Sequence, residues 1–118
     1  MQYLLLLFSD ESGWSTLSTG EKQRWMGAYG AYTEALMKAG VFVGASHLES
    51  SSAAATVRVV GGKANVMDGP FAESKEQLAG YFIIDVPDVD TAITWATRHP
   101  AASHGAVEVR RIGTPPTP

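Results

Sequence analysis

The chain of 118 residues is long enough for one folded domain and too short for two. Hydrophobic residues make up 45% and charged residues 18%, which is the balance of a globular chain and not of a disordered one. The formal net charge of -3 argues against direct nucleic-acid binding, and the absence of cysteine excludes disulfides, thiolate nucleophiles and cysteine-ligated metal sites.

The N-terminal part predicts two strands around one long helix. Residues 3–8 form an unbroken apolar run, typical of a strand that is covered on both faces in the middle of a sheet. The run is too short for a membrane span and lacks the features of a leader, so we expect a cytoplasmic protein with no membrane association. Ser18 and Glu21 form a capping-box pattern that begins a helix, and Gly40 ends it. A second strand is predicted over 41–47.

The C-terminal part begins with a predicted hairpin. Residues 56–60 and 63–67 flank a Gly-Gly pair, which is typical of a two-residue hairpin turn. The polar stretch 72–80 is expected to hold a helical turn. The remaining predictions are a strand over 81–86, a helix capped by Asp88 or Asp90 that ends at His99, a strand over 106–112 and a frayed, proline-rich tail over 114–118.

This order of elements, β–α–β followed by a β-hairpin and then by β–α–β, is that of the ferredoxin-like α+β class. We expect an antiparallel sheet with two helices on one face, formed by a single domain over 1–113. Strands that are apolar on both sides imply that the second face of the sheet is also covered. A second copy of the chain is the simplest cover, so we expect a homodimer.

The segment 68–76 carries the most chemical information. A Gly-Pro pair after a strand makes a stiff bend and holds Asp68 at the end of that strand. The carboxylate of Asp68 either accepts hydrogen bonds from turn amides or acts in a site. Phe71 is expected in the core more than against a ligand, and Glu73 and Glu76 fit a solvated face better than acid–base groups.

This segment, continued as DGPFAESKEQLAGY to Tyr81, resembles the signature of the YCII-related proteins, in the subgroup named for its DGPF motif. The resemblance extends over nearly the whole chain. It includes Tyr3 to Leu6, the helix around Trp25 and from Tyr29 to Leu36, Ala55 to Arg58, and Gly105 to Arg110. It implies a dimeric α+β barrel of ferredoxin-like protomers, with residues 1–113 as one such domain.

The resemblance implies little about activity. Most members have no assigned activity, some are encoded beside or fused to extracytoplasmic-function sigma factors, and one relative in the wider superfamily is a dehydrochlorinase acting on a chlorinated hydroxyhydroquinone. A His–Asp pair that lines a cleft has been proposed as the active site of that superfamily. Where the superfamily has its early histidine, this chain has Trp14, Trp25 and Tyr29, so the pair does not carry over directly.

The three histidines of this chain show no metal-ligand spacing, so no metal site is expected. His99 precedes a proline at a helix end, which predicts a structural role in which a positive ring favours the helix dipole. His47 ends a predicted strand and His104 lies in a loop before the last strand. Either of these two could face a cleft.

Charged residues inside the predicted strands are the remaining candidates. Arg58 alternates with two valines on one strand, and Glu108 and Arg110 alternate with two valines on the last strand. If the polar faces of these strands look into the interior between two protomers, the three residues line a pocket together with Asp68. They then form either a salt-bridge network or a site that binds anions and transfers protons. An arginine pair suits a carboxylate or phenolate ligand.

We therefore predict a homodimer that binds a small anionic or phenolic molecule near the DGPF turn, with proton-transfer or elimination chemistry. The candidate catalytic residues are Asp68, His47 and His104, and the candidate substrate-binding residues are Arg58, Phe71, Glu108 and Arg110. No metal and no cofactor is expected. The alternative is a non-catalytic sensing module that acts with a sigma factor in transcription regulation, and fold analogy adds a cofactor-free oxygenase as a third reading.

Overall fold

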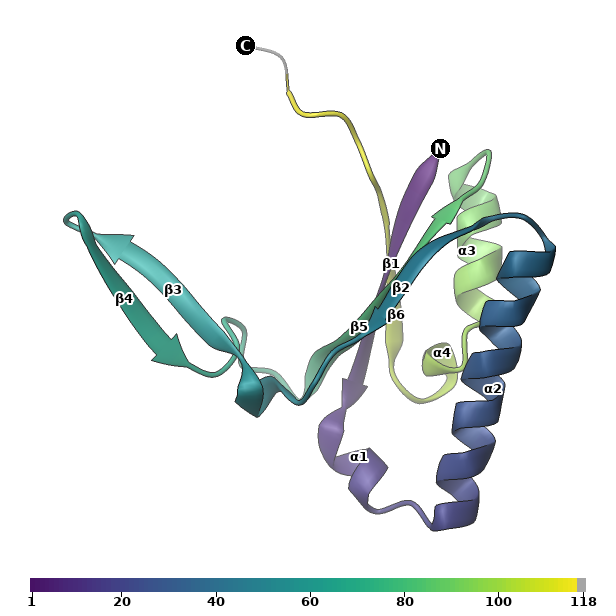
Figure 1. Ribbon diagram of the computed structural model, residues 1–118, viewed down its shortest axis with the longest axis horizontal. Coiled ribbons are helices and arrows are strands. Elements are labelled where there is room, and N and C mark those ends of the chain that lie inside the picture. The colour runs from purple at the N-terminus through teal and green to yellow at the C-terminus, as the bar shows by residue number, and fades with distance from the viewer. Residues whose placement is uncertain (117–118) are drawn as a thin grey trace.

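A four-stranded antiparallel sheet forms the centre of the computed structural model, which describes residues 1–116 (Figure 1). Its strands lie in the order β2 (Phe42–His47), β5 (Glu76–Asp85), β1 (Gln2–Asp10) and β6 (Ala106–Arg111). The two unbroken apolar runs of the sequence, β1 and β5, are therefore the two central strands, as predicted.

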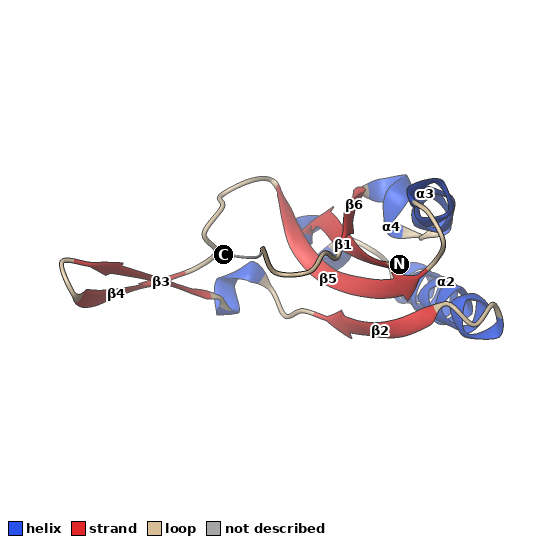
Figure 2. Ribbon diagram, turned by 90° about the horizontal axis from the view of Figure 1, so that it is seen from above, coloured by secondary structure: helices blue, strands red, loops and turns tan. Residues whose placement is uncertain are grey.

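Two helices, α2 (Thr19–Lys38) and α3 (Val89–Arg98), cover one face of this sheet (Figure 2). This arrangement confirms the ferredoxin-like α+β prediction. Three further short helices join the elements: α1 (Glu11–Ser15), the 3₁₀ helix η1 (Ser51–Ala53) and α4 (Ala101–His104).

Side-chain caps explain where the two long helices begin. The Ser18 hydroxyl accepts a hydrogen bond from the Glu21 amide, and the Glu21 carboxylate accepts one from the Ser18 amide, both at 3.2 Å. Asp88, one of the two caps predicted for α3, accepts a hydrogen bond from the Thr91 amide at 2.8 Å. Gly40, with φ of 71°, ends α2 in the left-handed conformation that favours glycine.

The core lies between the sheet and the helices. Alternate residues of β1 point toward the helices, because successive side chains of a strand point to opposite faces. The Tyr32 hydroxyl of α2 donates a hydrogen bond to the Trp95 carbonyl of α3 at 2.8 Å, which joins the two helices above the sheet. The buried apolar residues are Tyr3, Leu5, Leu7, Tyr32, Leu36, Phe82, Ile84, Val86, Ala92, Ala96 and Ala101.

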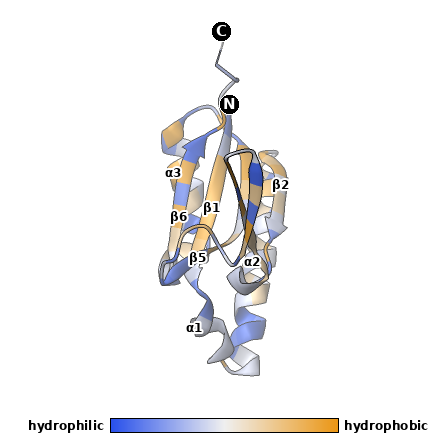
Figure 3. Ribbon diagram, turned by 90° about the vertical axis from the view of Figure 1, so that its left-hand side faces the viewer, coloured by the Kyte–Doolittle hydropathy of each residue, from blue (hydrophilic) through white to orange (hydrophobic). Residues whose placement is uncertain are grey.

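The opposite side of the sheet, here called the open face, is apolar as well. Its central residues are Leu4, Leu6 and Phe8 of β1 and Tyr81 and Ile83 of β5. These side chains are only partly buried, and Figure 3 shows the hydrophobic strands of this face behind the hairpin. That a second copy covers this face, as expected from sequence, stays a prediction.

The predicted hairpin forms as expected but lies apart from the main sheet. Strands β3 (Ala55–Val60) and β4 (Lys63–Asp68) pair only with each other. Gly61 and Gly62 have φ of 58° and 76°, which the two-residue turn requires. Figures 1 and 2 show that the hairpin projects away from the helices, on the side of the open face.

The projecting hairpin gives the molecule unusual dimensions. The chain measures 49 × 46 × 18 Å, with a radius of gyration of 16.5 Å. A compact domain of this length has a radius of gyration of about 13 to 14 Å. The single chain therefore exposes more surface than a self-contained domain of its size does.

One local prediction is wrong. Residues 72–80 hold no helical turn, because β5 already begins at Glu76 and the residues before it form an irregular loop. The Gln77 amide group donates to the carbonyls of Ala72 and Ser74, at 3.1 and 2.8 Å, and so holds this loop in place. The stretch after β1, for which no element was predicted, contains α1, whose first turn Asp10 caps.

The ends of the chain add two observations. The described part of the predicted tail, 114–116, has no helix or strand, and residues 117 and 118 lie outside the described residues. Within residues 1–116, no helix is both long enough and apolar enough to cross a membrane.

Candidate functional site

A hollow of about 520 Å³ lies where the end of β1 and the start of β5 meet the end of α4. Asp10, the last residue of β1, pairs with Glu76, the first residue of β5. His104 is the last residue of α4. The residues that line this hollow, here called the His104 hollow, are Asp10, Ser74, Lys75, Glu76 and His104.

Gly105 brings His104 to this place. A Cβ atom at Gly105 would lie 2.0 Å from the carbonyl oxygen of Phe8, which is far inside van der Waals contact. Only glycine therefore lets the chain pass so close to β1 between α4 and β6. This close approach places the end of α4 beside the end of β1.

Two aromatic side chains of α2 hold the His104 ring. The Tyr29 hydroxyl lies 3.3 Å from His104 Nε2, and the Trp25 ring meets the imidazole edge to face at a centroid distance of 4.7 Å. Burial raises the pKa of Tyr29, so its hydroxyl keeps its proton near neutral pH and can donate it in a hydrogen bond to Nε2.

The charged residues of the hollow have both signs. The Lys75 ammonium group lies 4.0 Å from Asp10 Oδ2 and is mostly exposed. Asp10 accepts a hydrogen bond from the Ser12 hydroxyl at 2.7 Å and another from the Ser12 amide at 3.0 Å. These two bonds, the hydroxyl bond first, lower the pKa of the Asp10 carboxyl. Asp10 is therefore a carboxylate near neutral pH, with Lys75 beside it as a cation that can meet an anionic ligand.

The loop that carries Lys75 directly follows the DGPF turn. Thr56 Oγ1 donates to the Gly69 carbonyl at 2.9 Å, and the Gly69 amide donates to the Ala54 carbonyl at 2.7 Å. The Ser74 hydroxyl donates to the Glu76 carbonyl. The turn and the loop after it are thus fixed at both ends, which positions Lys75 at the hollow.

Of the residues predicted from sequence, only His104 lines this hollow. His47 lies exposed at the end of β2, and Asp68 lies exposed at the end of β4. Among residues 1–116, the Asp68 side chain accepts no hydrogen bond, so the predicted bonds to turn amides are absent. The Glu73 side chain is exposed, in agreement with a solvated face.

The predicted polar pocket of Arg58, Asp68, Glu108 and Arg110 is not gathered within one chain. The Arg58 guanidinium lies over the Phe71 ring, 5.0 Å from its centroid, at the base of the hairpin. Glu108 and Arg110 form an ion pair on the open face of β6, opposite Leu6 and Leu4. In the described chain, no hydrogen bond or ion pair joins the hairpin group to the β6 pair.

Two single-residue predictions are corrected here. Phe71 is 73% exposed, so it is not part of the core of the single chain. His99 is 1% exposed, and this burial lowers the pKa of its ring to about 4, with a smaller contribution from the nearby His104 ring. The ring is therefore neutral and not the positive group predicted at the helix end. Its role is structural, because Nδ1 accepts a hydrogen bond from the Ala101 amide at 2.9 Å.

The prediction from sequence did not include four residues that line or support the hollow, Asp10, Lys75, Trp25 and Tyr29. Lys75 lies between Glu73 and Glu76, which fit a solvated face, and Asp10 lies just after the apolar run of the first strand. The spacing of Trp25 and Tyr29, four residues apart on one face of a predicted helix, was the available signal. It indicates a shared contact but does not identify His104 as the residue contacted.

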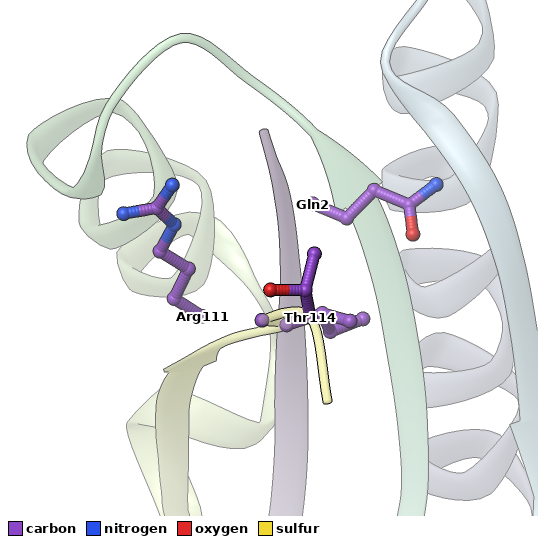
Figure 4. A pocket seen from close by; sticks show the side chains of 5 residues that line it. Gln2, Arg111 and Thr114 are labelled. Atoms are coloured by element: carbon purple, nitrogen blue, oxygen red, sulfur yellow. The ribbon is translucent and has the colours of Figure 1, made fainter. Parts of the chain in front are cut away.

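A second hollow of about 640 Å³ lies where the C-terminal segment leaves β6 (Figure 4). It is lined by Gln2, Arg111, Ile112, Gly113 and Thr114. Figure 4 shows the side chains of Gln2 and Arg111 extending in different directions. The polar groups do not converge, so this hollow does not have the character of a specific binding site.

No group of three or more metal-binding side chains was found among residues 1–116.

The comparison with known families decides the relationship of the chain. The model of the YCII-related domain matches residues 1–114. The chain belongs to the YCII-related family. A protein of Rhizobium meliloti strain 1021, described as uncharacterised, is 40% identical to this YCII-related chain over 114 residues, which cover 95% of this chain and 92% of the relative. The family predicted from sequence is confirmed, and membership of the DGPF subgroup stays a prediction.

Proposed function

We propose that this YCII-related protein, a member of the DGPF subgroup, is a cytoplasmic homodimer that binds a small anionic or phenolic molecule in the His104 hollow. The observation that carries the proposal is the meeting of His104, held by Tyr29 and Trp25, with Lys75 in one hollow. A concave site with a few convergent polar groups is the usual form of a small-molecule site.

The two groups suit different parts of such a ligand. The Lys75 ammonium group attracts a carboxylate or phenolate, because the carboxylate of Asp10 does not fully enclose it. An imidazole has one nitrogen that can accept a proton and one that can donate a proton, so His104 is the group suited to general acid–base work. In an elimination, His104 would take a proton from the ligand, the freed electron pair would form the new double bond, and chloride or another leaving group would depart.

The open face supports the homodimer. Leu4, Leu6 and Phe8 present an apolar strip at the centre of a sheet whose other face is fully covered by helices. Exposed apolar patches of this kind mark interaction surfaces. A second copy would cover them in a closed, twofold arrangement.

The ligand proposal is tested with two variants and one control. We expect His104→Gln and Lys75→Gln each to weaken the binding of salicylate, measured by calorimetry, at least tenfold. Lys63→Gln, at the tip of the hairpin, removes the same charge away from the hollow and is expected to leave binding unchanged. Equal binding by all four proteins would show that the hollow is not the site.

The reaction is tested with a chlorinated hydroxyhydroquinone, by following chloride release. Release by the unaltered protein and its loss in His104→Gln would support acid–base chemistry. Salicylate binding without any turnover would favour the alternative, in which the same hollow serves a sensing module that acts with an extracytoplasmic-function sigma factor.

A further inference from the structure

The β3–β4 hairpin has an apolar side that the described chain leaves uncovered. Val57 pairs with Val66 and Val59 pairs with Ala64, and these two pairs lie on one side of the hairpin. The valines at 57, 59 and 66 are 59%, 69% and 61% exposed. An isolated two-stranded hairpin is marginally stable in water, so these residues need a surface to pack against.

The other side of the hairpin is suited to solvent. It carries Arg58 opposite Asn65, with Lys63 opposite Val60 next to the turn and Met67 toward the base. The middle of the hairpin is therefore amphipathic, because neither apolar pair carries a charge and the charged residue on their side, Asp68, lies at the base of the hairpin. This asymmetry indicates that the side with the two apolar pairs is the contact surface.

Hydrogen bonds at its base fix the direction of the hairpin. The Glu11 carboxylate accepts hydrogen bonds from the Ser51 amide at 2.8 Å and from the Ser50 hydroxyl at 3.0 Å. On the other side of the base, the bond from the Gly69 amide to the Ala54 carbonyl closes the neck. The hairpin is thus held away from its own sheet and does not fold back to cover the open face.

The open face and the hairpin border the same space. In Figure 1 the helices lie on one side of the main sheet and the hairpin on the other, and Figure 3 shows the hairpin in front of the apolar strands. A body that packs on the open face, at the usual distance of about 10 Å between sheets, therefore lies beside the hairpin as well.

We infer that the β3–β4 hairpin is an arm that wraps around a second copy of this chain and packs its apolar pairs against that copy. The inference rests on the proposed homodimer and adds a second, separate contact to it. A second copy is the occupant that fits best, because each copy carries two uncovered apolar surfaces, the open face and the apolar side of the hairpin. In a twofold dimer the same contacts form twice, so all four surfaces of the two copies are covered.

The first test uses three separate variants, each with one glutamate at a different position. Sedimentation equilibrium is expected to show a dimer for the unaltered protein. Val59→Glu, on the apolar side of the arm, should raise the dissociation constant of the dimer about 100-fold, since two buried carboxylates per dimer each cost at least tenfold. Asn65→Glu, on the polar side, is the matched control and should change it less than threefold. Leu6→Glu, on the open face, should give monomers.

A second test does not depend on a disruptive variant. The chain has no cysteine, so Asn65→Cys provides a unique position for a spin label on the polar side of the arm. Labelled chains are mixed with unlabelled, isotope-enriched chains, and the spectrum of the unlabelled copy is recorded. Broadening of signals from the open face of the unlabelled copy is expected only if the arm of the other copy lies against it.

The outcomes separate the arm from the dimer. If Leu6→Glu gives monomers but Val59→Glu remains dimeric and the signals of the unlabelled copy are not broadened, the homodimer proposal holds and the inference that the hairpin is an arm is wrong. If the unaltered protein is monomeric at every concentration, both are wrong. Neither result bears on salicylate binding in the His104 hollow, which has its own variants.

Discussion

His99 shows how strongly the surroundings of one residue decide its behaviour. It lies among the rings of Tyr29, Tyr32 and Phe82, at centroid distances of 4.6 to 5.3 Å. In the sequence it looks like a helix-end histidine that gains from a positive charge. In the fold its burial makes that charge costly, so it is a neutral acceptor for the Ala101 amide.

This burial predicts a pH dependence of stability. The pKa of His99 falls from about 6.5 in the unfolded chain to about 4 in the folded one. Below pH 6.5 the unfolded chain therefore binds a proton that the folded chain does not, and stability is lost as the pH falls. We expect the free energy of unfolding by urea to drop by about 2 kcal/mol between pH 7.5 and pH 5.0.

The variant His99→Asn tests the assignment, because asparagine can accept the Ala101 amide but does not titrate. Its free energy of unfolding should be nearly the same at both pH values, although lower than that of the unaltered protein at pH 7.5. His47→Asn, at an exposed histidine, should keep the full dependence. An unchanged slope in His99→Asn would assign the effect to another group.

Gly105 provides the second prediction at this scale. Gly105→Ala should lower the free energy of unfolding by about 2 to 3 kcal/mol, since the added methyl group overlaps the Phe8 carbonyl oxygen and the chain has to shift. Urea unfolding measures the loss. Gly113→Ala is the control, because a Cβ atom there meets nothing within 4 Å. Equal stability of the two variants would contradict the close approach.

At the scale of elements, local sequence signals predict what forms but not where it lies. The capping box of α2, the Gly-Gly turn of the hairpin and the apolar runs of β1 and β5 depend on neighbours within a few residues, and each is confirmed. The orientation of the hairpin depends instead on Glu11, which reaches Ser50 and Ser51 about forty residues away. No local pattern contains such a contact.

The same reasoning explains what was predicted of the candidate site. His104 could be selected because it lies in a connection just before a strand. Lys75 and Asp10 could not, because their meeting depends on the register in which β1 pairs with β5. The polar residues of β3 and β6 were placed on the correct strand faces, but the separation of their two sheets within one chain was not foreseen.

Glu11 yields a prediction for the base of the hairpin. Glu11→Ala removes the acceptor of the Ser51 amide, so this amide loses its hydrogen-bond partner at the base of the hairpin. We expect the exchange of the Ser51 amide hydrogen to become at least about tenfold faster, measured by NMR hydrogen exchange. Glu49→Ala, a nearby change at an exposed carboxylate, should leave this rate unchanged. An unchanged rate in Glu11→Ala would show that the carboxylate does not hold the hairpin.

At the scale of the whole molecule, the chain has a covered side and an uncovered side. The helices bury one face of the sheet, while the other face and the hairpin remain exposed. If a second copy completes the fold, association contributes to stability and the melting temperature depends on concentration. Raising the protein concentration from 1 to 100 µM should raise the melting temperature by about 5 °C.

Scanning calorimetry or circular dichroism measures this shift. Leu6→Glu provides the control, since its melting temperature should not change with concentration. A melting temperature of the unaltered protein that stays constant over this range would contradict association through the open face.

The separation of the hairpin from the main sheet has a consequence for how related chains can diverge. No member of the buried core lies between Leu36 and Phe82, so the core places no demand on the residues of β3 and β4. Substitutions there can alter which chains recognise each other without loosening the fold. After duplication of such a gene, substitutions in this one hairpin could be enough to stop the two protein products from forming mixed dimers within one cell.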